Sequence, residues 1–172
     1  MNRDDRAKGA ALLCCRFARN FAYYGAGQRL IRGTSDPFWL AVLGNFVDIS
    51  VLEWSKLFGN RNGKYHWQRV LNDPATFIAD MPTRIGVSKQ SFDTLYETVK
   101  TYRDEFVAHL EDKEVTTVPN MNVPYVLVWS YYLQLRKDYP FLQGIDELPR
   151  DYGNYWASHA KAATVIFGKV AA

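Results

Sequence analysis

The sequence predicts an all-α protein, a single-domain antiparallel bundle of five main helices with one or two short extra helices. Three observations predict this fold. Apolar residues recur at three- and four-residue spacing over most of the chain. No segment shows the alternation of a half-buried strand. A length of 172 residues suits one ordinary domain, which we expect to span 1–172.

The first two predicted helices differ in character. The first ends near Gly25 to Gly33, and its apolar positions are interrupted by arginines, which predicts an amphipathic helix at the edge of the bundle. The second follows Ser35, Asp36 and Pro37, which provide a cap and a proline suited to the first helical turn. Its apolar residues go nearly all the way round as far as Leu57, so we expect it to be central.

The following segments are shorter. The loop 59–63, GNRNG, has strong turn chemistry, and a short piece covers about Trp67 to Leu71 before the break at Asp73 and Pro74. Pro82 is expected to limit the helix that lies there.

Three more helices complete the bundle. Ser88 can cap a regular helix from about Lys89 to Lys113, which contains no glycine or proline. An aromatic helix is expected over Val123 to Leu135, and Pro149 is expected to begin a last helix that runs through Ile166.

Composition excludes several classes of protein. The 48% of apolar and 23% of charged residues exclude a fully disordered chain, and a net charge of +3 permits a polyanionic partner without demanding one. Cys14 and Cys15 are adjacent, so they form no disulfide framework. The apolar run Ala10 to Cys15 is too short for a signal sequence or a membrane span. We therefore expect a soluble protein in the reducing cytoplasm, without membrane attachment.

No cofactor or metal ion is expected. The sequence contains no Walker loop, no dinucleotide-binding glycine motif and no GxSxG elbow. Its three histidines lie far apart, and no HExxH or Glu-x-x-His pattern accompanies them.

Arg103 is the residue that does not suit its position. On the helix Lys89 to Lys113, an apolar stripe is formed by residues such as Tyr96, Val99 and Phe106, and Arg103 lies near its middle. A guanidinium keeps its charge, so on a buried face it needs a carboxylate, a phosphate or a solvated cleft. An internal ion pair, with Asp48 as one possible partner, or an arginine that reaches out past aromatic rings would also account for it.

His109 lies at the edge of the same stripe. In an α-helix it would be about 9 Å along the axis from Arg103 and roughly 120° around it, too far to hold one small group easily with Arg103. Two copies of the helix packed about a two-fold axis would bring their Arg and His residues together in one cationic cleft.

At these residues the sequence resembles the HEPN superfamily, whose members carry an Arg, a polar residue and then a His late in a small helical bundle. The matching run is Arg103 to His109, reading RDEFVAH, with Asp104 as the polar residue. The layout is most similar to the abortive-infection type of HEPN domain, in which a central helix ends in an apolar stretch and a loop, as Val51 to Phe58 does here. The sequence departs from some members in having Glu111, rather than Tyr, two residues after the His, which puts control by tyrosine adenylylation in doubt.

The resemblance implies metal-independent cleavage of single-stranded RNA at a homodimer seam. It implies that His109 acts as general base or acid, that Arg103 holds the phosphate, and that Asp104 orients the Arg or the partner's His. A prokaryotic toxin or phage-defence effector, with a possible antitoxin partner, fits this activity. The alternative is a non-catalytic HEPN-like helical module that binds RNA, a nucleotide or a partner protein.

The remaining basic and histidine positions leave two interpretations open. His66 lies beside Arg61, Lys64 and Arg69. It either contacts an RNA backbone or is part of a solvated loop, and we favour the solvated loop. His159 follows several aromatic residues and is expected at the edge of an aromatic core. The arginines of the N-terminal third form either a phosphate-facing surface or the solvated side of a helix.

Overall fold

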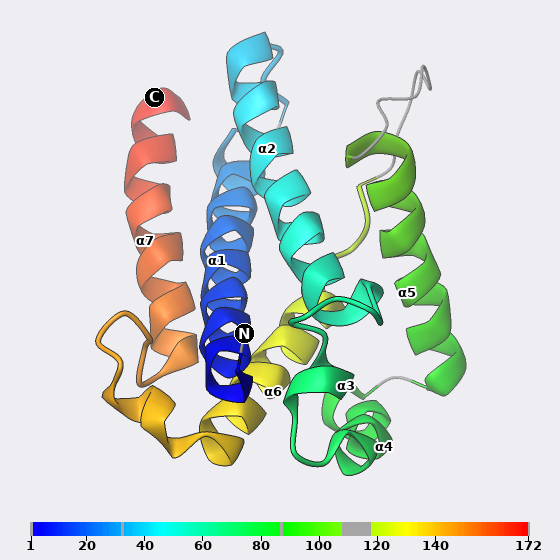
Figure 1. The fold of residues 1–172 in the computed structure, drawn as a ribbon. Helices are drawn as coiled ribbons and strands as arrows, with labels where there is room; N and C mark the ends of the chain where they lie inside the picture. Colours follow the sequence, from blue (N-terminus) through cyan, green and yellow to red (C-terminus); the bar gives the residue numbers. More distant parts are fainter. Residues whose placement is uncertain (1, 32, 87, 108–117, 172) are drawn as a thin grey trace.

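The computed structural model describes residues 2–31, 33–86, 88–107 and 118–171. The described residues are all-α and contain no strand. The longest helix, α1 (Arg3–Leu30), is surrounded by three other long helices (Figure 1). These are α2 (Pro37–Trp54), α6 (Asn122–Asp138) and α7 (Tyr152–Ala171). The shorter α3 (Trp67–Val70) and α4 (Pro74–Ile85) lie at the end of the bundle that holds the N-terminus, and α5 (Lys89–Tyr102) stands along its side. The predicted fold class is confirmed.

The expected positions of the first two helices are wrong. The central helix is α1, which packs against α2, α6 and α7, whereas α2 leaves large apolar side chains exposed. The reason is the small side chains of α1: fully buried alanines such as Ala10, Ala18 and Ala22 let neighbouring helices approach from several sides. Its arginines project between these contacts, so a count of charges along the helix overestimated its exposure.

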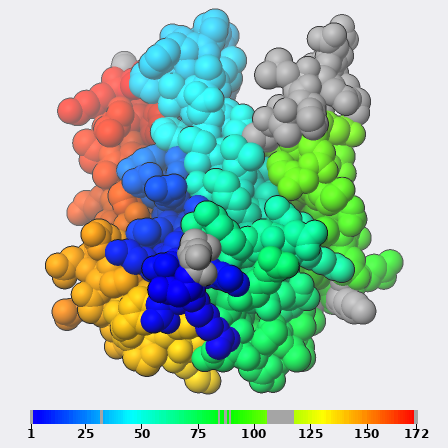
Figure 2. Space-filling view, in the orientation of Figure 1, coloured from blue at the N-terminus to red at the C-terminus, as the bar shows by residue number. Residues whose placement is uncertain are grey.

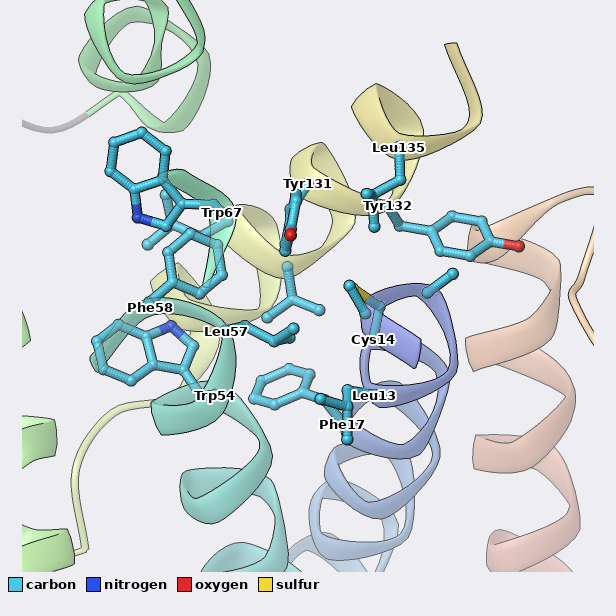
Figure 3. Packing of buried hydrophobic residues seen from close by; sticks show 14 of the residues in the cluster. Leu13, Cys14, Phe17, Trp54, Leu57, Phe58, Trp67, Tyr131, Tyr132 and Leu135 are labelled. Carbon is cyan, nitrogen blue, oxygen red and sulfur yellow. The ribbon is translucent and has the colours of Figure 1, made fainter. Parts of the chain in front are cut away.

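The main core lies where α1, α6 and the end of α2 meet. Leu13, Cys14 and Phe17 from α1 face Tyr131, Tyr132 and Leu135 from α6, as Figure 3 shows. Both cysteines are free, and burial raises the pKa of the Cys15 thiol to about 12, so it stays protonated and unreactive.

Two helices, α2 and α5, are each extended by a π-helical turn. The turn η1 (Ser55–Gly59) continues α2, and η2 (Arg103–Val107) continues α5. The expected regular helix from Lys89 to Lys113 is therefore wrong from Arg103 to Val107, because a π turn pairs residues five apart and rotates less per residue than an α-helix. Residues 108–113 of that expected helix lie outside the described part of the chain.

Two prolines behave differently from the expectation. Pro82 lies inside α4, which runs on to Ile85 although Pro82 has no N–H to donate to the preceding turn. The helix ends at Gly86, whose φ of 67° is left-handed and suits a residue without Cβ. The last helix begins at Tyr152, three residues after Pro149, and extends beyond Ile166.

One segment, Pro37–Gly59 (α2 with η1), is long and apolar enough to cross a membrane, with a mean hydropathy of 1.2. This is weak evidence for a span, because a core helix of a soluble protein has the same length and composition. Only 39% of its apolar window is buried within the fold. Figure 2 shows α2, in light blue to cyan, uncovered on the face in view.

Candidate functional site

The sequence resemblance concentrates on the end of α5. This helix begins at Ser88, whose hydroxyl accepts a hydrogen bond from the N–H of Ser91, and it stays α-helical up to Tyr102. At Arg103 the backbone N–H is shared between the carbonyls of Lys100 and Val99, and the π turn η2 begins. Single π turns inside helices are found frequently at functional sites.

Arg103 forms an ion pair with the next residue. Its Nε donates to Oδ1 of Asp104 at 2.6 Å, and one terminal nitrogen donates to the same oxygen. The Arg103 side chain is 26% exposed, so it is neither sealed in the core nor fully solvated.

Lys100 completes the group. Its Nζ lies 3.3 Å from Oδ2 of Asp104, so one carboxylate lies between two cations. Partial desolvation raises the pKa of Asp104, but the hydrogen bonds and charges of Arg103 and Lys100 outweigh it and hold this pKa below its ordinary value. The three side chains together carry one net positive charge, which suits an anionic ligand.

Asp48, which the sequence offered as a possible partner for Arg103, has a different contact. The hydroxyl of Tyr102 donates to Oδ1 of Asp48 at 2.8 Å and so fastens the end of α5 to α2. Burial, reinforced by this hydrogen bond and the charge of Asp48, raises the pKa of Tyr102. The suggested Arg103–Asp48 ion pair is therefore replaced by Arg103–Asp104, and Tyr102 is a positioning residue that no sequence motif singled out.

His109 lies outside the described residues. The structure thus brings Arg103 and Asp104 together and says nothing of the third predicted site residue. The separation of about 9 Å and 120° that an α-helix would give does not apply, because η2 lies between the two positions.

The other two histidines are structural. His66 is 1% exposed; its Nε2 donates to the carbonyl of Phe58 at 2.9 Å, and its Nδ1 accepts from the N–H of Gln68 at the start of α3. The favoured interpretation of His66 as part of a solvated loop is therefore wrong, and neither ring nitrogen is left for the RNA-backbone contact that was the alternative. His159 is joined to the Tyr23 hydroxyl at 2.9 Å and packs against the ring of Tyr155, as expected for an aromatic core edge.

A pocket that the sequence did not predict lies beside this region. Its volume is about 330 Å³, and it opens between α5 and the segment from η1 to α3. Phe58, His66 and Trp67 are its buried floor, and Phe92 and Tyr96 from α5 are half-buried walls. Its lining residues come from three separate segments, 58–68, Ile78 of α4 and 92–97, so no single motif predicts it. The nearest sequence signal was the aromatic and basic run around His66.

Among residues 2–31, 33–86, 88–107 and 118–171, no group of three or more His, Cys, Asp or Glu side chains is arranged to hold a metal ion. Comparison of the chain with protein-family models, with curated proteins and with solved structures finds no match.

Proposed function

We propose that this chain is a cytoplasmic, HEPN-type endoribonuclease that cleaves single-stranded RNA at a composite site on a homodimer seam. The observation that carries the proposal is the half-buried Arg103 at the π turn, held by Asp104 with Lys100 on the other carboxylate oxygen. A guanidinium oriented in this way is ready to hold a phosphodiester, because its remaining donors match phosphate oxygens.

The chemistry is an attack within the RNA strand. His109 removes the proton from a ribose 2′-hydroxyl, the 2′-oxygen attacks the adjacent phosphorus, and the bond to the 5′-oxygen breaks with protonation of the leaving oxygen by the partner's imidazole. Arg103 offsets the charge that develops on the phosphorane. The products are a 2′,3′-cyclic phosphate and a 5′-hydroxyl, and no metal ion takes part.

The exposed face of α2 supports the homodimer. Phe38 is 64% exposed and Ile49 is 39% exposed, and the two lie on the same side of a helix whose first charged residue is Asp48. Such an apolar face is typical of an interaction surface. Because Tyr102 fastens α5 to this helix, a second copy packed along α2 brings its own Arg103 towards the same seam. A prokaryotic toxin or phage-defence role, with an antitoxin as a further partner, is the biological setting that we propose.

Product analysis tests the chemistry. The purified protein is incubated with single-stranded RNA in EDTA, and the ends of the fragments are identified by mass spectrometry. The proposal expects 2′,3′-cyclic phosphate ends and no cleavage of a 2′-O-methyl RNA. Cleavage of the 2′-O-methyl strand, or activity that EDTA abolishes, would reject it.

A second candidate is a non-catalytic helical module that binds RNA, a nucleotide or a protein. The observation that favours it is the ion pair of Arg103 with a carboxylate of its own chain, which satisfies the guanidinium without a partner copy. On this account the protein binds RNA with no cleavage, and a gel-shift assay run beside the product analysis separates the two functions.

A further inference from the structure

The pocket between α5 and the η1–α3 segment has the composition of a ligand site. An aromatic floor and walls enclose about 330 Å³, and charged side chains stand at the mouth. The rim consists of the exposed Arg61 from the loop after η1 and of Asp93 and Glu97, one turn apart on α5. Small-molecule sites commonly combine an apolar interior of this size with a few polar groups that fix orientation.

Hydrogen bonds hold the walls of this pocket in place. The Tyr96 hydroxyl donates to the carbonyl of Gly59 at 2.9 Å and fastens α5 to the end of η1. His66 does the same within the floor by its bond to Phe58, and Asn60 N–H donates to the carbonyl of Ser55 at 2.9 Å. A pocket fixed in this way loses little conformational entropy when a ligand binds.

The walls and the rim specify the ligand together. Flat aromatic walls favour a planar ring that stacks or packs edge-on, as an unpaired nucleobase does on protein aromatics. The two carboxylates at the rim only accept hydrogen bonds, and guanine alone among the RNA bases offers two adjacent N–H donors on its Watson–Crick edge, which match the two oxygens of one carboxylate. Arg61 suits the phosphate that the base carries, whereas it would repel a simple organic cation.

We propose that this pocket binds a guanine base through Asp93 and Glu97, with Arg61 on its phosphate. Free guanosine nucleotide and a guanine within single-stranded RNA share this chemistry. For the RNA source, the inference rests on the proposed ribonuclease function. Arg103 begins η2 seven residues after Tyr96, about 10 Å further along the helix axis, so a strand that leaves the pocket along this axis reaches Arg103.

Binding assays test the pocket without any cleavage. Calorimetry measures GMP and AMP against wild-type protein and against the double variant Asp93→Asn, Glu97→Gln, with Glu147→Gln as a control far along the chain in an exposed loop. We expect GMP to bind wild type and the control at least tenfold more tightly than AMP, and the double variant to retain less than a threefold preference. Circular dichroism confirms the fold of each variant, because the three changed side chains are exposed.

Two hexanucleotides of 2′-O-methyl RNA, identical but for one guanine replaced by adenine, distinguish the sources. Preference for GMP alone assigns the pocket to a free nucleotide, and preference for the guanine strand assigns it to RNA. The inference is overturned if neither GMP nor the guanine strand is preferred threefold, or if the preference survives in the double variant. If the protein binds guanine but cleaves no RNA, the guanine site is supported and the proposed function is rejected. If it cleaves RNA without any preference for guanine, the proposed function is supported and the guanine site is rejected.

Discussion

The Tyr102 hydroxyl donates a hydrogen bond to Oδ1 of Asp48 at 2.8 Å and joins the end of α5 to the partly exposed α2. Arg103 follows directly and begins the π turn η2. The contact therefore fixes the backbone from which the guanidinium projects, and it links the candidate site to the helix that we propose as the dimer seam.

Tyr102→Phe tests this contact. The variant keeps the ring, which is buried, and removes the donor to a half-buried carboxylate, so the free energy of unfolding should fall by about 1–3 kcal/mol. Asp48→Asn retains an acceptor oxygen and should cost less. Urea unfolding followed by circular dichroism measures both, and a loss for Tyr102→Phe no greater than that for Asp48→Asn would contradict the assignment.

Gly27 and Gly25 form a matched pair on the central helix. A Cβ at Gly27 would lie 2.2 Å from Cδ2 of the buried Leu43 and 3.1 Å from the ring of Phe167, whereas Gly25 meets only the end of Arg29 at 3.7 Å. Gly27→Ala should therefore destabilise the fold by about 1–3 kcal/mol through overpacking. Gly25→Ala should stabilise it by up to about 1 kcal/mol through helix propensity. Thermal unfolding that ranks the two variants the other way would show that α1 does not pack against α2 and α7 as described.

The buried His66 predicts acid sensitivity. Burial lowers its pKa below the ordinary 6.5, an effect that the nearby Arg61 and Arg69 reinforce and the hydrogen bond to Phe58 opposes. Because the folded-state pKa is the lower one, the contribution of His66 to stability is present in full above pH 6.5 and is lost as the pH falls through the folded value.

His66→Asn separates this contribution from the rest. Asparagine can still cap α3, but the bond to Phe58 is lost, so unfolding at pH 7.5 should cost about 1–3 kcal/mol less. His159, whose pKa burial and Arg19 also lower, remains in both proteins. The loss of stability between pH 7.5 and pH 5 should thus be smaller, not absent, in His66→Asn. Equal acid sensitivity of the two proteins would show that His66 can charge without breaking its contacts.

The proposed seam predicts the oligomeric state. Ile49→Glu places a charge on the exposed apolar face of α2, and Leu133→Glu places one on a more exposed position of α6. Ile49→Glu should weaken dimerisation at least tenfold in sedimentation experiments, whereas Leu133→Glu should not. A monomeric wild type, or a dimer that both variants leave intact, would remove α2 from the seam.

Much of the fold could be predicted because it depends on local signals. Caps such as Ser88, the breaks at glycine and proline, and the 3.6-residue period located the starts of most helices to within a few residues. The central position of α1 could not be predicted, because its alanines are only weakly apolar in the sequence pattern. Their small side chains nevertheless permit the closest packing of helices. The π turns were also missed: they change hydrogen-bond pairing without a distinctive composition.

Part of the candidate site could also be predicted, because that part depends on local sequence. An arginine on an apolar stripe is visible in the sequence, and so is its acidic neighbour Asp104. That Tyr102, not Arg103, bonds Asp48 depends on how α5 meets α2, which no local pattern specifies. The pocket beside Tyr96 depends likewise on three separate segments.

The central claim is that Arg103 and His109 together cleave RNA, and the most direct measurement is the initial rate on single-stranded RNA in EDTA. Wild type is compared with Arg103→Ala and His109→Ala, and with Arg150→Ala as a control on an exposed loop. We expect each of the first two variants to lose at least about a hundredfold in rate, as removal of a general base or a phosphate clamp does, while Arg150→Ala keeps the wild-type rate. Equal rates in all four proteins, or no cleavage by wild type, would contradict the claim.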